Sequence, residues 1–104
     1  MGLTVPSAAM VVGSLRLTLR LHGVASLKAK RSPRQKIVQR VRNRFKVAAG
    51  EVDTQDVWNL LTLGFSAVGP SEAAVDRVLH DVADFVEELA EGELIDEEFF
   101  IERH

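Results

Sequence analysis

The chain has 104 residues, a length that predicts one hydrophobic core, and its 46% apolar and 27% charged content argues against disorder, collagen-like repeats and coiled coil. It has no cysteine, which excludes disulfides, thiolate nucleophiles and cysteine-ligated metals, and no apolar run approaches the roughly 18 residues that span a bilayer, so we expect a cytoplasmic protein outside the membrane. The formal net charge is only -2, but positive and negative residues are segregated along the chain. All but two of the 13 Lys and Arg residues precede Glu51, and all 15 Asp and Glu residues lie from Glu51 onward.

The N-terminal part predicts a disordered extension followed by a strand. Residues 1–9 show no periodicity, so we expect one domain over 10–104 with a mobile segment before it. From Leu15 to Leu21 every second residue is leucine, which predicts a half-buried strand that Gly23 ends. The residues expected on its other side are Ser14, Arg16, Thr18 and Arg20.

A basic connection over 26–31 is expected to lead into a first helix. Ser32 would cap this helix, Pro33 suits the first helical position because it has no N–H to satisfy, and Gln35 stands where a capping-box partner would. The apolar stripe consists of Ile37, Val38, Val41 and Phe45. Basic residues spaced four apart form an exposed ridge, namely Lys36, Arg40 and Arg44.

The acidic half predicts two strands, a second helix and a last strand. A short strand over 46–52 would end in the polar turn 53–56, and a longer strand would follow over 58–68. Its two faces would carry Leu61, Leu63, Phe65 and Ala67 on one side and Trp58, Leu60, Thr62, Gly64 and Ser66 on the other. After the turn at 69–72 comes a strong helical stripe from Ala74 to Leu89. Gly92 would stop that helix in a left-handed conformation, before a strand over 93–102.

This order of elements predicts a ferredoxin-like α+β fold, β-α-β-β-α-β, with two helices on one face of a four-stranded antiparallel sheet. Its two β-α-β crossovers are expected to be right-handed. That handedness would bring the first and last strands together as neighbours in the sheet.

Three segments of the chain are similar to the YlxP-like family, a bacterial domain of unknown function numbered 503. They are Met10-Val11-Val12-Gly13, Ser26-Leu27-Lys28-Ala29-Lys30-Arg31, and Glu51-Val52-Asp53-Thr54-Gln55-Asp56-Val57-Trp58 ahead of Leu63-Gly64. The resemblance runs from Met10 to the end, with Pro33 and the acidic tail as departures. It implies a ferredoxin-like fold, a usual start at Met10, and encoding beside transcription and ribosome-maturation factors in some bacteria. It assigns no catalytic residue.

The basic segment 28–46 suggests a partner that is a polyanion. Its candidate contacts are Lys28, Lys30, Arg31, Lys36, Arg40 and Arg44. The alternative is a solvated helix face, or pairing with acids of the second helix such as Asp76, Asp84 and Glu88. Exposed pairs contribute only about 0–1 kcal/mol each, so stability alone hardly demands the segregation. We therefore expect a non-enzymatic module that binds RNA or a ribosomal particle.

The open face of the sheet suggests a second hypothesis, a homodimer. Candidate interface residues are Arg16, Thr18, Trp58 and Leu60. The alternative is that Trp58 covers the core of a monomer. Only Trp58 on this face could stack a base, so we do not expect base-specific recognition. The competing function is thus a homo-oligomeric interaction module whose basic ridge meets an acidic protein.

An enzymatic site is the weakest hypothesis. Asp53, Gln55 and Asp56 could bind a divalent cation or transfer protons, but Asp is common in turns because its side chain bonds nearby N–H groups. The three histidines, His22, His80 and His104, fall on separate elements without the spacing of metal ligands. We therefore expect no catalytic residue, no metal and no cofactor.

Overall fold

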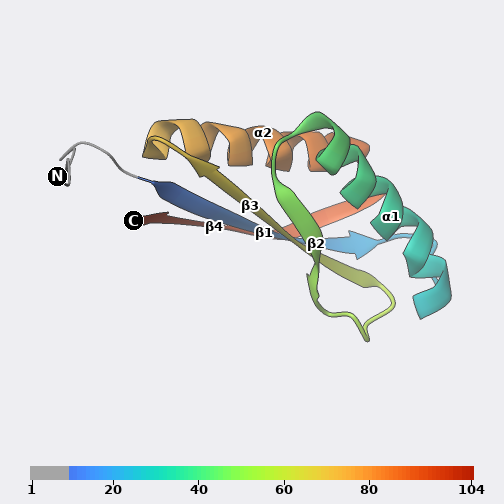
Figure 1. Cartoon of the computed structure of the whole chain (residues 1–104). Helices are drawn as coiled ribbons and strands as arrows, with labels where there is room; N and C mark the ends of the chain where they lie inside the picture. The colour runs from blue at the N-terminus through green and yellow to red at the C-terminus, as the bar shows by residue number, and fades with distance from the viewer. Residues whose placement is uncertain (1–9) are drawn as a thin grey trace, which may run out of the picture.

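Six elements follow one another in the predicted order in the computed structural model, which describes residues 10–104 (Figure 1). The extension expected over 1–9 lies outside the described residues. The elements are β1 (Val11–Leu21), α1 (Leu27–Arg44), β2 (Ala48–Asp53), β3 (Leu60–Gly69), α2 (Glu72–Leu89) and β4 (Gly92–Arg103). No helix among residues 10–104 is both long and apolar enough to cross a membrane.

The four strands form one antiparallel sheet in the order β2-β3-β1-β4. The first and last strands are therefore neighbours, as the crossover argument predicts. Figure 1 shows α1 and α2 on the same face of the sheet, with the opposite face open. The ferredoxin-like α+β arrangement is thus confirmed.

The core lies between the sheet and the two helices. The alternation of β1 is confirmed, because its leucines are buried while Arg16 and Arg20 are exposed. From α2 the core receives Val75, Leu79, Val82, Ala83 and Val86. Ser71 caps α2 by accepting a hydrogen bond from the Ala74 N–H at 3.1 Å. The two buried polar residues among those described are Lys30 and Thr62.

The predicted start of α1 is wrong. The helix begins at Leu27, and its cap is Ser26, whose hydroxyl accepts a hydrogen bond from the Ala29 N–H at 3.0 Å. Pro33 therefore lies inside the helix, where it cannot donate to the Ala29 carbonyl. Ser26 and Ser32 both have the chemistry of a cap. The contacts that Lys30 makes with a distant turn, described below, favour the earlier one.

The start of β3 also differs from the prediction, and this moves Trp58 out of the sheet. The strand begins at Leu60, and residues 54–59 form a turn closed by a hydrogen bond from the Val57 N–H to the Thr54 carbonyl at 2.9 Å. Thr54 has a φ of 56°, in the left-handed region. Trp58 is therefore a turn residue and does not share the open face of β3 with Leu60.

Two details of β4 depart from the predicted pattern. The pairing of β1 with β4 shifts between Thr18 and Leu19, so Leu94 packs on the core and Ile95 is exposed. Gly92 does not take a left-handed conformation but begins the strand. A Cβ at Gly92 would lie 2.5 Å from the Arg20 carbonyl oxygen, so glycine is required there for close approach of two backbones.

Candidate nucleic-acid interface

The outer side of α1 is a continuous polar surface. The helix buries Ile37, Val38 and Val41 against the sheet and contains no acidic residue. Its exposed side lines a shallow groove, called here the α1 groove, formed by Lys28, Arg31, Ser32, Gln35, Lys36, Gln39, Arg40 and Asn43. At 1.5 Å per residue, positions 28 to 43 extend over about 22 Å. The groove is thus a stripe of cations, amides and a hydroxyl along most of one helix.

The charges at the start of α1 are unusual for a helix. The first turn has no acidic residue, while Lys28, Lys30 and Arg31 lie close to the end where the helix dipole is positive. Cations there disfavour the helix by roughly 0.3–1 kcal/mol each at exposed sites. Stability does not explain the placement of Lys28 and Arg31, whereas an anion at the groove would benefit from both these side chains and the dipole.

Most cations of the groove have no acidic partner. Within residues 10–104, no ion pair joins an α1 cation to an α2 carboxylate, so the pairing with Asp76, Asp84 and Glu88 considered above is absent there. Lys36 reaches Glu91 at only 4.0 Å, and the Glu91 side chain is 88% exposed. Lys28, Arg31 and Arg40 make no ion pair in the described part of the chain. The groove therefore keeps its positive charge.

Lys30, predicted to contact nucleic acid, is instead a structural residue. Its side chain is 1% exposed, and its ammonium lies 2.7 Å from Glu51 Oε2, 2.8 Å from the Thr54 carbonyl oxygen and 3.0 Å from that of Val57. Arg34 lies 3.3 Å from the other Glu51 oxygen. Because the helix begins at Leu27, Lys30 falls on the same side as the core stripe and points inward. It is unavailable to a phosphate.

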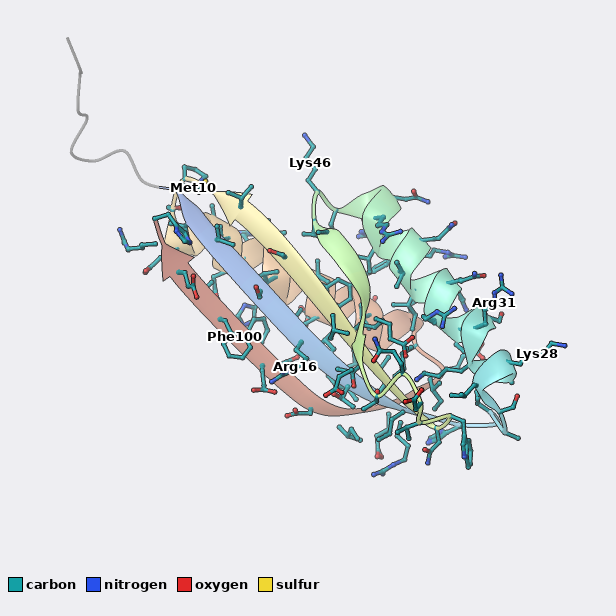
Figure 2. The ribbon with its side chains drawn as sticks, turned by 60° about the horizontal axis from the view of Figure 1, so that its bottom comes forward. Met10, Arg16, Lys28, Arg31, Lys46 and Phe100 are labelled. Carbon is teal, nitrogen blue, oxygen red and sulfur yellow. The ribbon has the colours of Figure 1, made fainter. Side chains whose placement is uncertain are left out.

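Arg44 is also separated from the α1 groove. Its guanidinium carbon lies 4.9 Å from the ring centre of Phe85 and 5.8 Å from that of Phe45, so it packs toward α2. The hollow that it lines there also contains the acidic residues Asp81, Asp84 and Glu88. Of the six predicted contacts, the structure therefore brings together four: Lys28, Arg31, Lys36 and Arg40. Figure 2 shows Lys28 and Arg31 projecting outward from α1.

The polar residues on the open face of the sheet are paired with one another. Arg16 contacts Glu98 at 2.6 Å, and Arg20 contacts Glu93 at 3.3 Å, in both cases from β1 to β4. The hydrogen bond and charge of Glu98 raise the pKa of Arg16 above its usual value. The Thr18 hydroxyl lies 3.3 Å from that of Thr62. Among residues 10–104, this face, unlike the α1 groove, offers no unpaired cation to a phosphate.

Three exposed apolar side chains on the open face are not among the interface residues predicted from the sequence. Val52, Val68 and Phe100 are 52%, 65% and 48% exposed. The guanidinium carbon of Arg16 lies 5.9 Å from the centre of the Phe100 ring. Figure 2 shows Phe100 and Arg16 next to each other on this face. The alternation of β4 contained the signal, because Phe100 follows the core residue Phe99 and must face the other way. Of the predicted interface residues, Arg16, Thr18 and Leu60 lie on this face and Trp58 does not.

The polar turn after β2 has a structural explanation. The Asp53 carboxylate accepts a hydrogen bond from the Thr54 N–H at 2.8 Å, as aspartates commonly do in turns. Within residues 10–104 there is no group of three or more His, Cys, Asp or Glu side chains placed to hold a metal ion. The geometry therefore adds nothing to the hypothesis of a cation site at Asp53 and Asp56.

The fold and this surface define a small ferredoxin-like α+β domain with one strongly basic helix. A family model described as "Protein of unknown function (DUF503)" matches residues 12–99, and the chain belongs to this family. It is 30% identical over 83 residues to "Uncharacterized protein YlxP" of Bacillus subtilis (strain 168), which covers 80% of this chain and 90% of that protein. The resemblance seen in the sequence is thus confirmed. A solved structure, "De novo designed protein Foldit4", matches 91% of this chain and 96% of its own with a TM-score of 0.48 and 12% identity.

Proposed function

We propose that the protein is a non-enzymatic cytoplasmic module that binds RNA, free or within a ribosomal particle, by contacting phosphates along the α1 groove. The observation that supports this is the row of four unburied cations, Lys28, Arg31, Lys36 and Arg40, on a helix face without a carboxylate. The adjacent α2 carries the acidic residues Glu72, Asp76, Asp81, Asp84, Glu87 and Glu88. A polyanion is attracted to one helix and repelled by the other, which fixes where it binds.

The composition of the α1 groove suits the phosphate backbone better than base edges. Gln35 and Gln39 stand between the cations and Asn43 follows Arg40, and their amide N–H groups can donate to any phosphate oxygen. In the part of the chain that the structure describes, no aromatic ring lines the groove. The α1 groove alone should therefore bind RNA with little preference for sequence.

The salt dependence of binding tests this proposal. Four neutralised phosphates give a slope of about -3 in a plot of log affinity against log salt concentration. Fluorescence anisotropy of a labelled RNA measures that slope. The variant Arg31→Gln with Arg40→Gln should lower its magnitude by about 1.5 and weaken binding to all RNA sequences alike.

A matched control removes the same charge elsewhere. Arg77 lies on α2 and Arg103 on β4, where it pairs with Glu72 at 2.9 Å, so Arg77→Gln with Arg103→Gln should leave the slope unchanged. A slope near zero for the wild-type protein, or equal losses in the two double variants, would refute binding at the α1 groove.

A second candidate function is self-association through the open face of the sheet, and the exposed Val52, Val68 and Phe100 favour it. In this form the protein is a homo-oligomeric interaction module, and the α1 groove would meet an acidic protein. An isologous dimer would cover the apolar side chains of both copies with one symmetric contact.

A further inference from the structure

The turn at residues 54–59, called here the Trp58 turn, is hydrogen-bonded to the first turn of α1. The buried Lys30 ammonium donates to the carbonyls of Thr54 and Val57, both in this turn. The Asn59 carbonyl accepts a hydrogen bond from the Leu21 N–H at 2.8 Å, at the end of β1. In Figures 1 and 2 the turn and the first residues of α1 lie side by side at one end of the molecule.

Large apolar side chains are exposed at this end of the molecule, where the α1 groove begins. Trp58 is 47% exposed, Val57 37% and Leu27 48%. Leu27 immediately precedes Lys28, which together with Arg31 begins the groove. The hydrophobic core does not include Trp58. An exposed indole at the end of the helix where a row of unpaired cations begins suits single-stranded nucleic acids, since a base can stack on the ring while phosphates further along the strand contact the cations.

The backbone that carries Trp58 is held rigidly. Thr54 keeps a left-handed conformation that a β-branched residue adopts at a cost, and several contacts maintain it. Its N–H donates to the Asp53 carboxylate, and its hydroxyl lies 2.9 Å from that of Thr62. With Lys30 on its carbonyl, every polar group of Thr54 is engaged. The ring is thus presented from a fixed support, which reduces the entropy lost on binding.

We propose that Trp58 stacks an unpaired base of an RNA strand whose phosphates occupy the α1 groove. This inference rests on the proposed function and adds the class of ligand, single-stranded RNA in preference to a duplex. A duplex keeps its bases stacked inside and can offer only phosphates. The nearby exposed Asp56 disfavours a phosphate at the ring but not a neutral base. Stacking accepts any base, so the preference is for strandedness and not for sequence.

The intrinsic fluorescence of the protein tests this directly, because the chain has one Trp and no Tyr. Emission at tryptophan wavelengths therefore reports on Trp58 alone. A short oligouridine should quench this emission as it binds, whereas an RNA duplex of equal length should bind without quenching. Anisotropy of a labelled oligouridine should show that Trp58→Ala weakens binding by about 5- to 150-fold, the equivalent of one base on an aromatic ring.

Two controls separate stacking from charge and folding. Trp58→Phe should retain most of the affinity because phenylalanine also stacks, and Trp58→Ala should keep the salt slope because no phosphate contact is lost. Circular dichroism should show both variants folded. Salt-dependent RNA binding with unquenched Trp58 and an unaffected Trp58→Ala variant would overturn stacking but leave the proposed function in place.

Two further results would also refute stacking of a base on Trp58. Absence of RNA binding at low salt would refute the proposed function together with this inference. A change of Trp58 emission with protein concentration alone, combined with no effect of oligouridine, would place the ring in a contact between two copies of the chain and refute stacking.

Discussion

Lys30 shows that the position of a helix start decides whether a cation binds a ligand or supports the fold. Its ammonium donates hydrogen bonds to two carbonyls of the Trp58 turn and forms an ion pair with Glu51. Lys30→Met would leave the Glu51 carboxylate buried without that cation and would remove one donor from each of two carbonyls of the Trp58 turn. Removing one partner of a buried pair costs about 3–5 kcal/mol, and we expect that loss in the free energy of unfolding measured with urea.

Lys28→Met is the matched control for this prediction, since the same chemical change is made two residues away on an exposed side chain. Its effect on stability should stay within about 0.5 kcal/mol. For RNA binding we expect the reverse order. Lys28→Met should weaken binding more than Lys30→Met, because only Lys28 lines the α1 groove. Equal stability of the two variants would contradict the structural role of Lys30.

At the scale of elements, the close packing of β1 under α2 and beside β4 depends on Gly13. A Cβ there would lie 2.4 Å from Val75 Cγ1, 2.8 Å from Leu79 Cδ1 and 3.0 Å from Ile101 Cδ1. Gly13→Ala therefore overpacks the core from several sides at once. We expect a loss of about 1–3 kcal/mol in the free energy of unfolding.

Gly50 in β2 offers the comparison, because a Cβ there would meet no atom within 4 Å. Gly50→Ala restricts the unfolded chain without a clash and should be neutral or stabilising by about 0.4–1 kcal/mol. Thermal unfolding of both variants measures the difference. If Gly50→Ala were as damaging as Gly13→Ala, the close approach of side chains at Gly13 would not explain the loss.

The elements that the sequence predicts correctly are those decided by their own hydrophobic period. β1 and α2 carry complete apolar stripes, and burial of those stripes determines their conformation. The start of α1 was mispredicted because Ser26 and Ser32 are both good caps, and the choice depends on oxygens that β2 and the Trp58 turn supply to Lys30. The bulge of β4 depends likewise on its partner strand.

The candidate site was predictable to the extent that exposure follows from helical spacing. Lys36 and Arg40 lie opposite the core stripe wherever the helix begins, so the spacing alone identifies them. Arg44 shares that spacing but packs against Phe85 of α2, a contact that no pattern within one helix reveals. The place of Trp58 required the turn geometry, which arises from Thr54 in a left-handed conformation.

At the scale of the whole molecule, the edges of the sheet limit how two copies could meet. β4 is an edge strand of 12 residues, long enough to pair with another strand. Its acidic residues are Glu93, Asp96, Glu97, Glu98 and Glu102. Like charges on two such edges repel each other, which protects the strand from edge-to-edge growth. A contact through the open face is the one that this distribution of charge favours.

Self-association is therefore expected to depend on Val68 and Phe100, which project from β3 and β4 on the open face. Sedimentation velocity over a range of protein concentrations should show a dimer for the wild-type chain. Phe100→Ser with Val68→Ser should weaken it at least tenfold, because fully burying a Phe or Val side chain contributes about 1.5–3 kcal/mol. Leu27→Ser removes an exposed apolar side chain from the far end of α1 and should leave the dimer intact. A wild-type chain that stays monomeric at high concentration would show that water, and not a second copy, covers these side chains, and RNA binding at the α1 groove would then be a property of the monomer.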